Sequence, residues 1–240
     1  MSGRGGWRAA LDLARAGNFP SVASNVLAAL VLARGGAWPA PAEAALALLA
    51  GWLAYAGGAT LNDVADAAFD AQHRPGRPIP SGALSRRAAA LLGVAELALG
   101  LALLALLGAV WFWVVGLAAV ILAYDWVHKR WAGSVVLMAG CRILLGLAVA
   151  SGTGWTGGMA VAGWVAALGV YIAGLSLLAR REYLPGAPAV RLGRWVGQLL
   201  AGIPFIDAAA LVVVGAPGPA LACALAVPLG RWAQRLAAAD

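Results

Sequence analysis

Long apolar runs separated by short polar segments form the pattern of this 240-residue chain. Each run contains about 20 residues, the length that an α-helix needs to cross the hydrocarbon core of a membrane. We predict eight transmembrane helices, at residues 18–34, 41–60, 86–107, 109–126, 133–152, 160–179, 193–214 and 218–236. Pro204 interrupts the seventh helix, so this segment can also form two short helices. The pattern predicts an all-α polytopic membrane bundle that occupies residues 1–240 as a single domain.

The amino-acid composition also favours a membrane protein. Hydrophobic residues make up 62% of the chain and charged residues 11%, and the mean hydropathy is +0.84. An ordinary water-soluble domain of this length is hardly ever so apolar. In residues 1–17, the first apolar stretch is interrupted by Arg4, Arg8, Asp12 and Arg15, so it does not resemble a secretory signal. We expect this segment to be cytoplasmic, in part as a short interfacial helix.

The basic residues lie almost entirely on one side of the predicted topology. If the helices alternate in direction, fifteen of the seventeen Lys and Arg residues fall on one side, Arg34 falls on the other, and Arg142 lies within a helix. Because basic loops are retained in the cytoplasm, we predict cytoplasmic termini and a location in the bacterial cell membrane. The net charge of +7 then suits anionic lipid head groups and requires no nucleic acid.

The segment NDVADAAFDAQHRPGRPIPSG, residues 62–82, carries the clearest candidate chemistry. Asp63, Asp66 and Asp70 share one face of a helix because of their spacing. Their mutual repulsion favours a hard cation such as Mg²⁺, which takes oxygen ligands and bridges to substrate phosphates. Arg74 and Arg77 follow, and guanidinium groups pair bidentately with phosphate oxygens. The combination predicts a metal-chelated diphosphate.

Three sequence elements together resemble the UbiA-type intramembrane prenyltransferases. They are NDxxDxxxD, then RPxRPIPSG, then a Tyr-x4-Lys element formed by Tyr124 and Lys129. The segments GNFPSVASNVLA, residues 17–28, and GCRILLG, residues 140–146, resemble parts of the first and fifth helices of that family. The resemblance implies a helical bundle around a central cavity that opens to the cytoplasmic side and laterally to lipid. In such a cavity a prenyl diphosphate is held through Mg²⁺, and its allylic cation is passed to an acceptor.

The same resemblance implies roles for individual residues. The expected residues are Asp63, Asp66 and Asp70 for the metal; Asn62, Arg74, Arg77 and Lys129 for the diphosphate; and Asp63, Asp66, Tyr124 and Lys129 for catalysis. The chemistry agrees, because ionisation of the donor needs positive charge at the leaving group and an aromatic, dry lining around the carbocation.

One element of the family pattern is missing. The family carries a second aspartate-rich motif between its sixth and seventh helices, whereas the stretch SLLARREYLPGAPAVRLGRW, residues 176–195, contains no aspartate. Its only acid is Glu182, either a lone metal ligand or a salt-bridge partner of a loop arginine. Two interpretations follow. Either Arg180, Arg181 or Arg191 replaces the charge of the second metal, with Arg181 as a further diphosphate ligand, or the protein binds an isoprenoid without turning it over.

Ionisable residues inside the predicted helices are costly in lipid and need a partner or a cavity. They are Glu96, Arg142 and Asp207. We expect a Glu96–Arg142 or an Asp207–Arg142 pair. Alternatively, Arg142 or Asp207 lines the acceptor end of the cavity.

Three further polar residues lie near the motifs. We expect His73 and His128 to be solvated loop residues rather than general bases or metal neighbours. We expect Asp125 to pair with Lys129 or Arg130.

The sequence therefore predicts transfer of an isoprenyl group from an allylic prenyl diphosphate to a small acceptor at the cytoplasmic face, with Mg²⁺ as cofactor. Members of the resembled family prenylate aromatic acids, quinone precursors, haem, chlorophyll precursors and glycerol-type lipids. The sequence does not identify which of these acceptors is used. Two alternatives stay open. One is a terpene cyclase of the same superfamily, and the other is a non-catalytic isoprenoid-binding or transport-related membrane protein.

Overall fold

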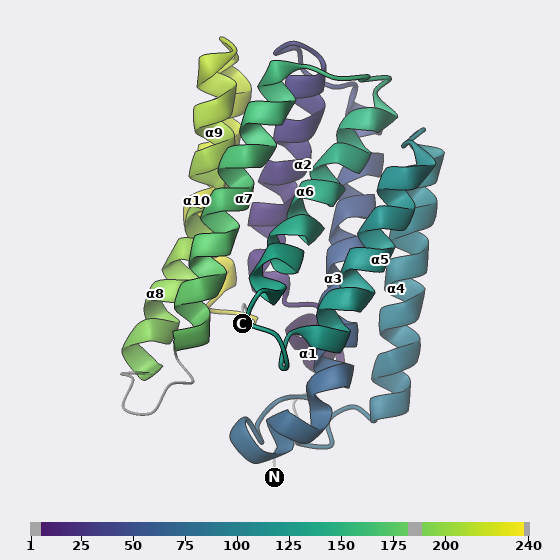
Figure 1. The fold of residues 1–240 in the computed structure, drawn as a ribbon, viewed down its shortest axis with the longest axis vertical. Coiled ribbons are helices and arrows are strands. Elements are labelled where there is room, and N and C mark those ends of the chain that lie inside the picture. The colour runs from purple at the N-terminus through teal and green to yellow at the C-terminus, as the bar shows by residue number, and fades with distance from the viewer. Residues whose placement is uncertain (1–5, 182–188, 238–240) are drawn as a thin grey trace.

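The computed structural model describes the backbone of residues 6–181 and 189–237 and the side chains of residues 6–181 and 192–237. Within these ranges the elements are helices that run side by side along the long axis of the molecule (Figure 1). They are α1 (Gly6–Leu13), the 3-10 turn η1 (Ala16–Asn18), α2 (Phe19–Ala33), α3 (Pro41–His73), α4 (Arg86–Leu106), α5 (Trp111–Val127), α6 (Ser134–Gly152), α7 (Met159–Arg180), α8 (Ala189–Gly202), α9 (Pro204–Val213) and α10 (Pro217–Ala233). The predicted all-α membrane bundle is confirmed.

The number of helices that can cross a membrane differs from the prediction. In the described part of the chain, six segments are long and apolar enough: Ala16–Ala33, Pro41–His73, Arg86–Leu106, Ser134–Gly152, Met159–Arg180 and Leu192–Val213. The other two predicted spans coincide with α5 and α10, which have 17 residues each. A helix of 17 residues is at the lower limit of the length that crosses a membrane. The apolar composition of these two segments predicts full spans, but their length as helices is shorter than that of the other six.

The seventh predicted span forms two helices, as its proline allows. α8 ends at Gly202, and α9 begins at Pro204. Proline has no backbone N–H to donate and is well suited to the first turn of a helix. Prolines also lie in the first turns of α2, α3 and α10, so the same rule fixes several helix starts.

α3 extends beyond the other helices at the end of the molecule that carries the amino terminus (Figure 1). Its 33 residues run from Pro41 to His73, a length of about 50 Å at about 1.5 Å per residue. A hydrocarbon core is about 30 Å thick. The second predicted span, residues 41–60, therefore continues without a break into the acidic motif, which lies on the final turns of α3.

α2 lies at the centre of the bundle, and ten of its fifteen residues are buried. It packs against α3, α6, α7, α9 and α10. The amino-terminal α1 packs against α3, with Ala9 and Leu13 buried and Trp7 exposed. An exposed tryptophan there suits the predicted interfacial helix.

Glycines allow α3 and α4 to approach closely. A Cβ atom added at Gly57 of α3 would lie 2.4 Å from the backbone nitrogen of Leu97, and one added at Gly100 of α4 would lie 2.4 Å from that of Ala54. Membrane helices associate through packing of this kind, because lipid supplies no hydrophobic force between them. α4 is therefore fixed against the helix that carries the acidic motif.

We expect Gly100→Ala to lower the free energy of unfolding by about 1–3 kcal/mol, because the new methyl group must separate two backbones. Reversible denaturation in mixed micelles measures this change. Gly163→Ala on α7 is the matched control, since no atom lies within 4 Å of the Cβ position there. Equal stability of the two variants would contradict the close packing of α3 and α4.

Candidate active site

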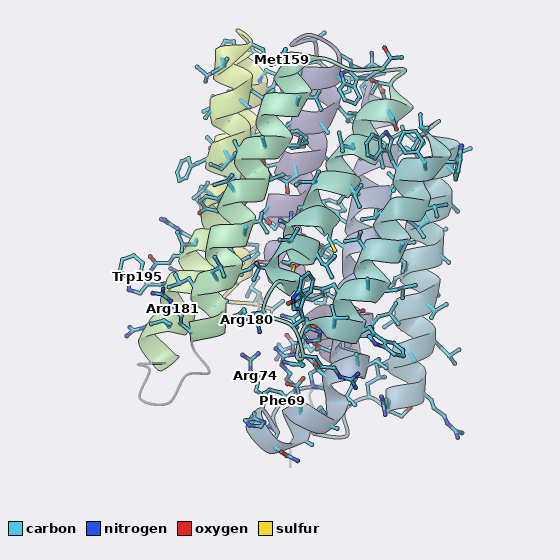
Figure 2. All side chains as sticks on the ribbon, in the orientation of Figure 1. Phe69, Arg74, Met159, Arg180, Arg181 and Trp195 are labelled. Atoms are coloured by element: carbon cyan, nitrogen blue, oxygen red, sulfur yellow. The ribbon has the colours of Figure 1, made fainter. Side chains whose placement is uncertain are left out.

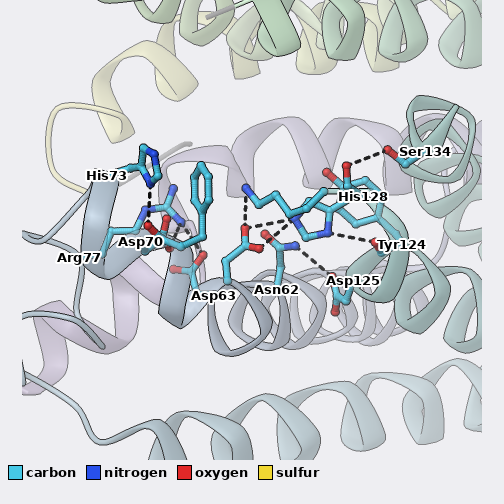
Figure 3. A network of polar contacts seen from close by, with 12 residues as sticks. Asn62, Asp63, Asp70, His73, Arg77, Tyr124, Asp125, His128 and Ser134 are labelled. Atoms are coloured by element: carbon cyan, nitrogen blue, oxygen red, sulfur yellow. Dashed lines mark hydrogen bonds and ion pairs between the residues drawn. The ribbon is translucent and has the colours of Figure 1, made fainter. Parts of the chain in front are cut away.

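The three acids of α3 face the inside of the bundle. Asp63, Asp66 and Asp70 expose only 5%, 7% and 2% of their surface. Their spacing places them on one face, as predicted from the sequence. Three buried carboxylates cannot stay charged side by side without compensation, and basic side chains from other segments provide it (Figure 3).

Asp63 and Asp70 are neutralised by arginines. Arg77 Nη1 lies 2.8 Å from Asp63 Oδ1 and 3.2 Å from Asp70 Oδ2. Arg15 Nη2 lies 2.8 Å from the same oxygen of Asp63. The backbone of Arg15 is left-handed, with φ of 48°, which is uncommon outside glycine. This conformation turns the chain between α1 and η1, where the guanidinium reaches α3.

Asp66 contacts two residues that follow α5. Lys129 Nζ lies 3.1 Å from Asp66 Oδ2, and His128 Nε2 lies 3.0 Å from Asp66 Oδ1. Lys129 also lies 4.1 Å from the centre of the Phe69 ring, and the His128 ring stacks on Tyr124. His128 is 8% exposed, so the prediction that it is a solvated loop residue is wrong.

Asp125 has a different partner from the one predicted. Asn62 Nδ2 donates a hydrogen bond to Asp125 Oδ1 at 3.1 Å, and neither Lys129 nor Arg130 forms an ion pair with Asp125 in the described structure. The other oxygen, Oδ2, is buried with no hydrogen-bond partner among the described residues. His73 lies exposed at the end of α3, with Nδ1 2.9 Å from the carbonyl oxygen of Phe69, which matches the expectation of a solvated residue.

A cavity of about 500 Å³ opens beside the acidic motif. Its charged lining comprises Arg15, Asp66, Asp70, Arg74, Arg77, Asp125, Lys129, Arg142 and Arg180. Its apolar lining includes Ala54, Leu117, Ile121, Leu145, Ile172, Leu175, Leu200 and Ile203. Asn62 and Tyr124 also face it, whereas Asp63 lies behind the lining. The structure thus joins most of the predicted site residues around one amphipathic cavity.

The two adjacent arginines at the end of α7 differ in position. Arg180 lines the cavity, and its Nη1 donates to the carbonyl oxygen of His128 at 3.1 Å and to Ser134 Oγ at 3.2 Å. Arg181 is exposed and is not part of the lining; in Figure 2 it lies towards α8. Of these two arginines, only Arg180 faces the cavity, whereas the diphosphate contact was predicted for Arg181. The side chains of Glu182 and Arg191 lie outside the described residues.

The ionisable residues inside the helices form two separate groups. Glu96 accepts a hydrogen bond from Thr60 at 3.0 Å and does not pair with Arg142. Arg142 and Asp207 are joined through Asn25, which accepts from Arg142 Nη1 at 2.7 Å and donates to Asp207 at 2.8 Å. The predicted pair is thus bridged by an amide. Arg142 lines the cavity, and Asp207 does not.

Several of these residues were not singled out in the sequence. Arg15 counted only as one cytoplasmic cation, and Asn25 and Ser21 had no assigned role. Arg15 contacts Asp63, which is 48 residues away in the sequence, and Asn25 contacts Arg142, which is 117 residues away. Such contacts arise only when the bundle forms. The one available signal was the segment GNFPSVASNVLA, which includes both Ser21 and Asn25.

Comparison with known proteins gives a consistent result. A family model described as the UbiA prenyltransferase family matches residues 22–239. Digeranylgeranylglyceryl phosphate synthase of Thermococcus kodakarensis is 34% identical over 122 residues, which cover 48% of this chain and 44% of that protein. The enzyme of the same name from Metallosphaera sedula is 43% identical over 79 residues, which cover 33% of this chain and 28% of that protein. The matched stretches thus span less than half of these relatives.

A solved structure from a study of digeranylgeranylglyceryl phosphate synthase in membranes has a similar fold. The TM-score is 0.61, the match covers 96% of this chain and 95% of that chain, and the sequence identity is 14%. At this identity the match supports the fold alone.

We expect Lys129→Gln to strengthen binding of a divalent cation in the absence of diphosphate, because Asp66 loses a cation that competes with the metal. Removing one partner charge at this separation changes the interaction by about 1–4 kcal/mol, so the affinity for Mn²⁺ should rise about tenfold. Titration followed by electron paramagnetic resonance measures it. Arg87→Gln removes an exposed cation near the start of α4 and is the control; an unchanged affinity in Lys129→Gln would show that the ion does not reach Asp66.

Proposed function

The chain belongs to the UbiA prenyltransferase family, and we propose that it transfers an isoprenyl group from an allylic prenyl diphosphate to a small acceptor. The observation that carries this proposal is the amphipathic cavity. Most of its acids and cations gather beside the motif of α3, and its remaining walls are mainly apolar, with Arg142 as a charged exception. A diphosphate with an isoprenyl chain has the same division into a charged head and an apolar tail.

The charged end of the cavity suits a diphosphate that is bound with Mg²⁺. Mg²⁺ uses one or two protein carboxylates and completes its coordination with phosphate oxygens and water. Asp66 and Asp70 present such carboxylates to the cavity, and no three acidic, His or Cys groups converge as a closed metal cage within the described ranges. The donor set therefore fits an ion shared with the substrate, with Asp63 as a further acid of the motif. When bound, Mg²⁺ supplies positive charge to the leaving diphosphate.

The basic side chains complete the binding of the leaving group. We assign diphosphate binding to Asn62, Arg74, Arg77, Lys129 and Arg180. Arg77 and Lys129 hold the acids in the absence of substrate, and their guanidinium and ammonium groups suit phosphate oxygens equally well. Charge that is already in place at the site of developing negative charge lowers the barrier to ionisation.

The allylic carbon lies between the diphosphate and the apolar walls. Tyr124 lines this part of the cavity, and an aromatic face stabilises a nearby cation. Leu117, Ile121 and Leu145 line the same cavity and offer no nucleophile. Such walls exclude water from the carbocation until the acceptor reacts.

We place the motif and both termini in the cytoplasm. This arrangement takes α5 and α10, with 17 residues each, as short crossings in addition to the six longer spans. α2 to α7 alternate in direction, α8 and α9 together make one crossing, and α10 returns (Figure 1). The basic residues gather at the end that carries the motif, whereas Arg34 lies at the other end, where it pairs with Glu43. This distribution follows the positive-inside rule.

A specific observation also favours the binding protein as a second candidate. Each acid of the motif already has a basic partner, and the second aspartate-rich motif is missing from residues 176–195. An enzyme of this arrangement must open ion pairs to admit Mg²⁺, whereas a binding protein can keep them. The name of the matched relatives makes a glyceryl phosphate lipid the first acceptor to test.

For catalysis, we expect purified protein with Mg²⁺ and labelled prenyl diphosphates to release diphosphate, and Asp66→Asn to lower the rate at least about hundredfold, as loss of a stabilising group at a leaving group does. Chelation of Mg²⁺ should have a similar effect. Glu43→Gln is the control, because it removes an acid at the other end of α3. If wild-type protein binds the donors and releases no diphosphate with any acceptor, the binding protein is the correct alternative.

If Arg180 replaces the charge of the second metal ion, its loss should weaken the binding of the leaving diphosphate. We therefore expect Arg180→Gln to lower kcat/KM about tenfold, as loss of a charge-assisted hydrogen bond does. Arg181→Gln is a closely matched control, because the neighbouring side chain is exposed and lies outside the cavity lining. Steady-state kinetics of diphosphate release measure both. A larger defect in Arg181→Gln would show that Arg181, as first predicted, contacts the substrate.

A further inference from the structure

Arg142 lies on the cavity wall well inside the bundle. Ser134, at the start of α6, contacts His128 and Arg180 at the charged end of the cavity. Arg142 follows Ser134 by eight residues on the same helix, which corresponds to about 12 Å at about 1.5 Å per residue. The guanidinium itself lies 5.0 Å from the centre of the Tyr55 ring, and Tyr55 precedes Asp66 by eleven residues on α3. Arg142 is therefore deeper in the bundle than the acids of the motif.

The direct partners of Arg142 are uncharged. Its Nη1 donates to Asn25 Oδ1 at 2.7 Å, its Nη2 donates to Ser21 Oγ at 3.1 Å, and the guanidinium lies 5.0 Å from the centre of the Tyr55 ring. No carboxylate forms an ion pair with Arg142 in the part of the chain that the structure describes. Arginine at such depth in a membrane is costly unless a charge or a polar cavity compensates it.

Asp207 compensates the positive charge of Arg142 only from a distance, because the side chain of Asn25 lies between them. It is fully buried and accepts hydrogen bonds from Ser24, Trp164 and Asn25. Asn25 lies between the two charges, and its amide oxygen faces Arg142 while its amide nitrogen faces Asp207. This orientation fixes the guanidinium at the cavity wall and leaves Asp207 behind it, away from the cavity.

We propose that Arg142 is an anion-binding subsite that recognises a carboxylate or phosphate group of the acceptor at the inner end of the cavity. The proposal rests on the proposed function, because it assumes that a prenyl donor occupies the charged end. A planar guanidinium matches the two oxygens of a carboxylate or phosphate. Its separation from the acidic motif leaves the space around Tyr124 for the reacting carbon and the nucleophile of the acceptor.

A purely structural role makes a different prediction. In that case Arg142 would only tie α6 to α2, and its removal would lower stability without changing the preference between charged and neutral ligands. An anion subsite instead predicts that ligand selectivity depends on the charge of Arg142. It also predicts that selectivity depends on Asp207, which lies outside the cavity and cannot touch the ligand.

The test compares ligand pairs that differ in charge, in protein reconstituted into nanodiscs. One pair is 4-hydroxybenzoate and its methyl ester, and the other is geranylgeranylglyceryl phosphate and geranylgeranylglycerol. Binding is measured by tryptophan fluorescence, with and without a non-reactive prenyl thiodiphosphate. We expect wild-type protein to bind the anion of at least one pair about tenfold more tightly than its neutral partner, since a charge-assisted hydrogen bond is worth about 1.5–3 kcal/mol. The pair that shows the preference identifies a carboxylate or a glyceryl phosphate as the source.

Two variants test the assignment. Arg142→Gln should abolish the preference while binding of the thiodiphosphate stays within about twofold, because the donor is held at the other end of the cavity by other charges. Asp207→Asn should increase the preference severalfold, because the positive charge of Arg142 loses its only nearby counter-charge of those described. Asp207→Asn also keeps the proposal testable if Arg142→Gln does not fold.

The outcomes separate the two proposals. Equal binding of both members of each pair, a preference that survives Arg142→Gln, or a preference unchanged in Asp207→Asn would overturn the anion subsite. Failure of the thiodiphosphate to bind would overturn the proposed function instead, because that measurement does not involve Arg142.

Discussion

The ion pairs around the acids of α3 are the interaction on which the rest of the site depends. Asp63, Asp66 and Asp70 lie on one buried face, and carboxylates so close together repel each other strongly where water is scarce. Arg15, Arg77 and Lys129 remove this repulsion. The three cations come from different segments, so the same contacts also fix the N-terminal turn, the loop after α3 and the residues after α5 around the mouth of the cavity.

These pairs give the site two possible uses of the same charges. In the absence of ligand, Lys129 compensates Asp66. In the proposed reaction a metal ion would take over the compensation of Asp66, and the ammonium group of Lys129 would then be available for the diphosphate that binds with the metal. The exchange is close to neutral in charge, because each ion pair that opens is replaced by a metal–carboxylate contact and a cation–phosphate contact. Binding of metal and diphosphate should therefore be strongly coupled.

The sequence predicted features that depend on local spacing. The apolar runs predicted the helices, the spacing of Asp63, Asp66 and Asp70 predicted one face, and Pro204 predicted the break between α8 and α9. The full spans predicted at α5 and α10 are the exceptions, because a helix of 17 residues fits either a short span or a buried helix.

Side-chain partners were much harder to predict. The sequence placed His128 in solvent, because the residue that covers it, Asp66, lies 62 residues away. Asp125 was assigned a neighbouring cation, whereas its partner, Asn62, lies 63 residues away. Short-range patterns contain no information on which helices meet. The same limit explains why Arg181 seemed as good a candidate as Arg180, since only the packing of α7 against its neighbours shows which of the two faces the cavity.

The charge balance of the cavity wall indicates the kind of ligand that completes it. Among the described residues, six basic side chains line the cavity, and only three acids do so: Asp66, Asp70 and Asp125. Because much of the cavity wall is apolar, an excess of positive charge there favours the entry of an anion. A diphosphate with one Mg²⁺ would bring a small negative charge to the mouth and leave Arg142 without a direct counter-charge at the inner end. Asp63 and Asp207 lie behind the lining and already offset part of this positive charge. An anionic group of the acceptor beside Arg142 would therefore complete the compensation locally, at the inner end, rather than for the cavity as a whole.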